Sequence, residues 1–68
     1  MSALVVKIPA KHRALGGAPN KPLQIVSLWE MTEGRIGVWV GEPGQATGTR
    51  WPVTDVTREQ VLSWQVKP

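Results

Sequence analysis

The sequence contains no cysteine, tyrosine or phenylalanine, and its one histidine is His12. Without cysteine neither a disulfide nor a thiolate metal ligand is available, and a single imidazole cannot supply a structural zinc site. The main acid–base groups are therefore His12, the lysines and five carboxylates, and no carboxylate lies close to His12 in sequence to orient it. We expect no metal, no cofactor and no catalysis within one chain; an active site formed only in an oligomer stays open.

Long apolar runs are absent as well. The apolar run at residues 3–6 ends at Lys7 and is too short for a signal-peptide core, and no run approaches the roughly 20 residues that span a bilayer. We expect a cytoplasmic protein without membrane contact. A chain of 68 residues forms a single domain with one small core, and self-association is the common stabilising device that this composition leaves open.

Positive charge is concentrated near the start of the chain. The formal net charge is +3, but residues 1–22 contain no acid, whereas residues 23–68 are slightly acidic. Residues 3–8 are rich in branched apolar side chains and predict a strand that Pro9 ends. The segment from Pro9 to Pro22 contains three prolines and the pair Gly16-Gly17, which predicts a long, mobile, basic loop or arm.

The strongest structural signal is a hairpin. Segments from Leu23 to Thr32 and from Arg35 to Val40 flank Glu33-Gly34, which predicts two antiparallel strands joined by a two-residue turn, with Thr32 opposite Arg35. This register predicts a core face made of Ile25, Trp29, Met31, Ile36, Val38 and Val40. The opposite face then carries Val26, Leu28 and Trp39.

The last third of the chain predicts another strand and a short turn. Residues 50–56 favour a strand that Pro52 confines to a sheet edge or a bulge. The segment from Thr57 to Gln60 fits a capping box, which favours a helix start, whereas the alternation of Leu62, Trp64 and Val66 favours a strand. A short 3₁₀ turn from Thr57 to Gln60 followed by a short strand satisfies both patterns.

In this order the elements resemble the SH3-like family. The resemblance covers most of the chain and implies a mainly β fold, a small barrel of about five strands with a long N-terminal loop. Peptide-binding members of the family use a cluster of tyrosines, which this chain lacks. No binding residue is therefore carried over, and the fold alone does not specify a function.

The outer face of the predicted hairpin indicates where binding occurs. A sheet with one core normally has a polar outer face, whereas Val26, Leu28 and Trp39 would form an apolar patch. We expect this patch to bind a protein partner or a second copy of the chain. Trp51 either closes the barrel or lies exposed at its rim, where it would join the same binding surface. The structural alternative is that the arm folds back and covers Trp39.

Nucleic-acid binding is the alternative function. The cations proposed to contact phosphates are Lys7, Lys11, His12, Arg13 and Lys21. Exposed tryptophans such as Trp39 or Trp51 would stack on unpaired bases. Salt separates the two functions, because a protein interface should survive high salt and phosphate binding should weaken steeply.

Overall fold

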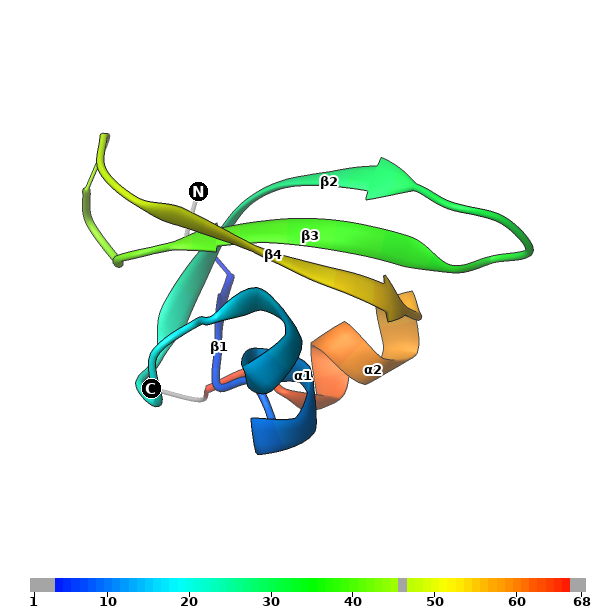
Figure 1. Ribbon diagram of the computed structural model, residues 1–68, viewed down its shortest axis with the longest axis horizontal. Coiled ribbons are helices and arrows are strands. Elements are labelled where there is room, and N and C mark those ends of the chain that lie inside the picture. Colours follow the sequence, from blue (N-terminus) through cyan, green and yellow to red (C-terminus); the bar gives the residue numbers. More distant parts are fainter. Residues whose placement is uncertain (1–3, 46, 67–68) are drawn as a thin grey trace.

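Four antiparallel strands and two short helices make up the computed structural model, which describes residues 4–45 and 47–66 (Figure 1). The elements are β1 (Val5–Val6), α1 (Ala10–Gly16), β2 (Leu23–Glu30), β3 (Ile36–Gly41), β4 (Arg50–Val56) and α2 (Arg58–Ser63). The strands form one sheet in the order β1-β2-β3-β4. The sheet curls into a half-barrel, and both helices lie on the same side of it. The prediction of a small, mainly β domain is confirmed.

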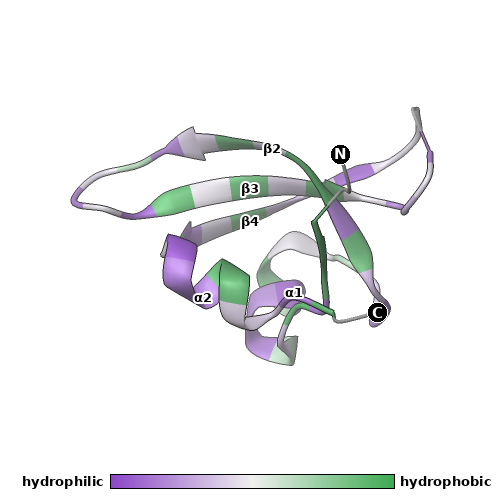
Figure 2. Cartoon of the chain, turned by 180° about the vertical axis from the view of Figure 1, so that it is seen from behind, coloured by the Kyte–Doolittle hydropathy of each residue, from purple (hydrophilic) through white to green (hydrophobic). Residues whose placement is uncertain are grey.

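The core lies between the sheet and the helices. Along β3 the side chains alternate, so that Ile36, Val38 and Val40 are buried and Trp39 is exposed. Figure 2 shows this alternation as hydrophobic segments separated by paler ones along β3. The buried apolar residues are Val6, Ile8, Ala18, Leu23, Ile36, Val38, Val40, Val53, Val56 and Val61.

The predicted turn of the hairpin is confirmed. Glu33 and Gly34 both have positive φ, 54° and 76°, and the N–H of Arg35 donates to the carbonyl of Thr32 at 3.1 Å. The N–H of Met31 donates to the carbonyl of Arg35 at 2.9 Å. Arg35 therefore faces both Met31 and Thr32, which is a β-bulge. The extra residue shifts the rest of the ladder by one position.

This shift makes the predicted register wrong. Trp29 was expected opposite Val38 in the core but pairs with Gly37, and Leu28 takes the place opposite Val38. Because side chains alternate with a period of two, one extra residue moves Trp29 to the outer face and Leu28 to the core side. Met31, another predicted core residue, is exposed. A second irregularity, at Val26, returns Ile25 to the core side, where it packs against the core.

The segment from Pro9 to Pro22 is not the irregular loop that the sequence predicted, because it contains α1. Pro9 immediately precedes the helix, and Gly17 follows it with φ 76° and donates its N–H to the carbonyl of Arg13 at 2.7 Å. Proline at a helix start and glycine after its end are boundary signals, although the same residues also occur in loops. Ala18, beyond the helix, is buried in the core.

The capping box at Thr57 is confirmed, but it begins an α-helix, not the single 3₁₀ turn that was predicted. The Thr57 hydroxyl accepts from the N–H of Gln60 at 3.1 Å, and the Gln60 side chain accepts from the N–H of Thr57 at 2.9 Å. Val56 and Val61, which flank this start, are both buried. Beyond α2 the predicted fifth strand is represented by a single bridge between Gln65 and Val6.

Candidate functional site

Two tryptophans lie on the sheet face that carries no helix. Trp39 projects between the buried Val38 and Val40, away from the core, with 39% of its surface exposed. The ring of Trp29 lies on Gly37, because a Cβ built at Gly37 would be 2.2 Å from Trp29 Cζ2. The two indole centroids are 5.7 Å apart, with the ring planes at 41°. Glycine at position 37 therefore makes room for the outer pair.

Because Trp29 lies on the outer face and not in the main core, its removal should cost less folding stability than the removal of a core tryptophan. We expect Trp29→Ala to cost about 2 kcal/mol and Trp39→Ala about 1 kcal/mol, because the first ring shields the strand at Gly37 and the second is more exposed. A tryptophan in the main core would cost about 3–5 kcal/mol. Urea unfolding followed by far-ultraviolet circular dichroism measures both losses. A larger cost for Trp39→Ala than for Trp29→Ala would contradict this order.

Among residues 4–45 and 47–66, the second half of β2 lies at an edge of the sheet, and we call this its free edge. β1 pairs with Leu23 and Gln24, and the N–H of Ile25 donates to the carbonyl of Leu4 at 2.9 Å. No strand in the described part of the chain pairs with the outer side of residues 26–30. Met31 donates to Arg35 across the hairpin, and the bonds of an antiparallel ladder alternate along each strand. The N–H and carbonyl groups of Leu28 and Glu30 therefore point away from β3, out of the sheet.

An open apolar groove of about 190 Å³ lies beside this edge. Leu28 from β2 and Leu62 from α2 line it and are 51% and 58% exposed. The remaining lining residues are Leu4, Ile25, Ile36, Val38, Val61 and Arg58. We call the free edge of residues 26–30 together with this groove the edge groove. It places peptide groups that have no strand partner in the described part of the chain beside an apolar surface.

The predicted patch of Val26, Leu28 and Trp39 is not one surface. Leu28 lies on the core side of the sheet and Trp39 on the outer side, while Val26 lies at the second irregularity and is 46% exposed. Trp51, expected either to close the barrel or to lie exposed at its rim, pairs with Val40 and packs against the core. Val26 and Leu28 therefore stay together at the edge groove, and Trp39 belongs to the outer pair. Their part in binding stays a prediction.

Leu62 is the groove residue that the sequence pattern did not identify. The alternation of Leu62 with Trp64 predicted a strand, but α2 continues through Ser63. On a helix, successive residues point about 100° apart, so Val61 enters the core and Leu62 reaches the groove. The capping box at Thr57 was the signal that favoured this helix.

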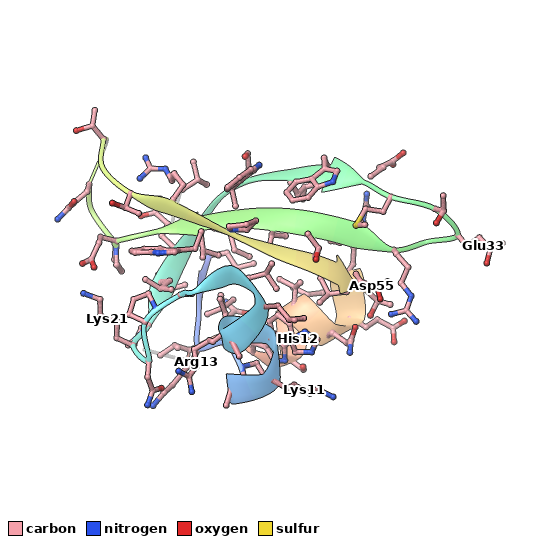
Figure 3. The ribbon with its side chains drawn as sticks, in the orientation of Figure 1. Lys11, His12, Arg13, Lys21, Glu33 and Asp55 are labelled. Atoms are coloured by element: carbon pink, nitrogen blue, oxygen red, sulfur yellow. The ribbon has the colours of Figure 1, made fainter. Side chains whose placement is uncertain are left out.

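The cations proposed for phosphate contact are not brought together with the outer tryptophans. They are Lys7, Lys11, His12, Arg13 and Lys21. Figure 3 shows Lys11 and Arg13 on the helix side of the sheet and Lys21 at one end of it. Trp39 projects from the opposite face. The structure therefore does not combine these cations and Trp39 in one site.

Two of these cations already have partners within the fold. Lys21 Nζ forms an ion pair with the Glu42 carboxylate. Arg13 Nε donates a hydrogen bond to the carbonyl of Ile8 at 3.0 Å. Both contacts would compete with a phosphate for the same side chains.

Acidic side chains gather at the turn end of the sheet. The charged residues there are the carboxylates Glu30, Glu33, Asp55 and Glu59 and the guanidiniums Arg35 and Arg58. Arg35 Nε lies 3.7 Å from Asp55 Oδ1, and Arg58 Nη2 lies 3.9 Å from Glu30 Oε1. Such exposed pairs contribute at most about 1 kcal/mol each. With four carboxylates against two guanidiniums, this end is acidic.

The opposite end of the sheet is basic. Lys7 directly follows β1, and Lys21 precedes β2 by one residue. Arg50 begins β4, where it pairs with Gly41 and its side chain covers that glycine. Glu42 is the one acid at this end within the described residues. The two ends of the sheet therefore carry opposite net charge.

Residues 4–45 and 47–66 contain no group of three or more histidine, aspartate or glutamate side chains arranged to hold a metal ion. Neither helix in these ranges has the length and hydropathy needed to cross a lipid bilayer. Comparison of the chain with protein-family models, with curated proteins and with solved structures found no match.

Proposed function

We propose that this chain is a non-catalytic protein-binding module that receives an extended protein segment as an added strand along the edge groove. The observation that carries the proposal is the free edge of residues 26–30 beside the half-exposed Leu28 and Leu62. In strand addition, main-chain hydrogen bonds supply affinity and a pocket for alternate side chains supplies specificity. The edge groove supplies both the main-chain groups and the apolar pocket.

The contrast between the two sides of the sheet supports this site. Proteins usually protect free strand edges with proline, charge or irregular backbone. β4, the other edge strand, contains Pro52 and has Asp55 in the left-handed region at φ 58°. Residues 26–30 contain no proline, and their one charged side chain is Glu30 at the far end. Their one irregularity lies at Val26, at the other end, so residues 27–30 keep a regular register. The β2 edge is therefore the one suited to accept a strand.

We also infer that the half-barrel is a small SH3-like barrel, with residues 64–66 as its fifth strand. Two main-chain hydrogen bonds support this inference. The N–H of Val66 donates to the carbonyl of Val5 at 2.8 Å, and the N–H of Lys7 donates to the carbonyl of Trp64 at 2.9 Å. These bonds run along β1 on the side away from β2, which is where a closing strand would lie.

Nucleic-acid binding is the second candidate, favoured by the absence of acid from residues 1–22 and by the exposed Lys11 on α1. It has less support than strand addition. Arg13 and Lys21 have partners within the fold, and Trp39 lies on the opposite face. Binding that weakens steeply as salt rises would favour this candidate over a protein interface.

A short synthetic peptide tests strand addition. We expect a peptide in which valine alternates with threonine, with lysine at each end, to shift the amide signals of Leu28 and Glu30 in ¹H–¹⁵N spectra and to slow their hydrogen exchange. A matched peptide with proline in place of threonine should do neither, because proline lacks the N–H that pairs with an edge. The absence of any shift at these amides at about 1 mM peptide would contradict the proposal.

A further inference from the structure

We infer that the segment bound in the edge groove is residues 26–30 of a second copy of this chain, paired antiparallel about a two-fold axis at Leu28. The inference rests on the proposed function, because it uses the same free edge. It adds the identity of the partner. The same strand is then both the acceptor and the added segment.

A two-fold axis at Leu28 makes the free edge self-complementary. The N–H and carbonyl of Leu28 point out of the sheet, so two copies can exchange a pair of hydrogen bonds at the axis. Glu30 of one copy then stands opposite Val26 of the other, and the two carboxylates do not face each other. A contact of this isologous kind closes with two copies, so it produces a dimer and not a fibre.

The same axis covers the exposed leucines. The two Leu28 side chains would lie side by side on the groove side of a continuous sheet, each next to Leu62 of its own copy. These leucines are half-exposed in the single chain. On the outer face Trp29 of one copy would stand opposite Ser27 of the other, which continues the tryptophan-bearing surface across both copies.

Charge favours a second copy over an unrelated segment. At the turn end β2 carries Glu30, and Glu33 follows it. The other end stays net basic after the Lys21–Glu42 ion pair, because Lys7 and Arg50 also lie there. Antiparallel pairing places the acidic end of each copy toward the basic end of the other, and such complementarity orients and stabilises an encounter. A parallel arrangement would bring like charges together. Self-association also supplies a stabilising device to a chain that has no disulfide.

Sedimentation velocity of the chain and two charge variants tests the inference. The unmodified chain should be a dimer at about 100 μM. Leu28→Asp places two carboxylates at the axis and should weaken the dimer by roughly 30-fold or more, the scale of an interface hot spot. Leu15→Asp adds the same charge to α1 at a side chain that is 82% exposed, and should leave the dimer intact.

A second measurement applies if Leu28→Asp does not fold. In the unmodified chain, protection of the Leu28 amide from hydrogen exchange should rise with protein concentration, while that of the buried Val40 should not depend on it as steeply. A chain that is monomeric at about 1 mM, or a dimer that a folded Leu28→Asp leaves intact, overturns the inference. A dimer in which the Leu28 amide gains no protection overturns it too.

The peptide experiment separates the two proposals. A monomeric chain whose Leu28 amide still responds to the valine–threonine peptide overturns the second copy and leaves strand addition standing. A monomeric chain whose edge amides ignore the peptide overturns both. A dimer that forms through the edge and that the peptide displaces supports both.

Discussion

Replacing Leu23 by alanine should lower the free energy of unfolding by about 3 kcal/mol. Leu23 begins β2, pairs with Val6 of β1 and is fully buried, with 0% of its surface exposed. Removing its branched side chain leaves a cavity that the surrounding valines fill only in part. Small domains lie near the low end of the usual range of about 5–15 kcal/mol, so the loss is a large share of the total.

Urea unfolding followed by tryptophan fluorescence measures this loss, at one fixed protein concentration so that any dimer contributes equally. Leu15→Ala is the matched control, because it removes the same atoms from a side chain that is 82% exposed on α1. We expect the control to change stability by no more than about 0.5 kcal/mol. Similar losses in the two variants would contradict the placement of Leu23 in the core.

Replacing Gly16 by alanine should cost about 2–3 kcal/mol, although alanine is the better helix former. Gly16 ends α1 where the helix meets β4, and a Cβ built there would lie 2.1 Å from the main-chain oxygen of Pro52. A main-chain oxygen cannot rotate away as a side chain would. The helix would therefore have to move away from the strand, which loosens the contact between α1 and β4.

The sign of the stability change in Gly16→Ala distinguishes a close contact with β4 from the effect of helix propensity alone. If α1 did not approach Pro52, Gly16→Ala would stabilise the protein by up to about 1 kcal/mol through helix propensity alone. Ala14→Gly, at an exposed position of the same helix, measures that propensity without touching β4. Thermal unfolding of the two variants compares the cost of the contact with Pro52 with the gain in helix propensity. A stabilised Gly16→Ala would contradict the close contact between α1 and β4.

Features that depend on neighbouring residues could be predicted from the sequence. The turn at Glu33-Gly34 followed from a glycine that tolerates positive φ, and the capping box followed from the spacing of Thr57 and Gln60. The alternation along β3 correctly separated Val38 and its buried neighbours from Trp39. Each of these signals lies within a few residues, so local stereochemistry and a period of two suffice to predict it.

The candidate site depends on contacts between distant segments. One extra residue beside the hairpin turn exchanges the faces of Trp29 and Leu28, and a second irregularity at Val26 returns Ile25 to its predicted side. No local pattern sets where an extra residue enters. Within the described residues, 26–30 form a free edge because β1 is only two residues long and pairs with the start of β2. Leu62 reaches the groove because α2 packs against the curled sheet. Register and edge exposure depend on the packing of the whole chain, since each is a choice among pairings with similar local propensities.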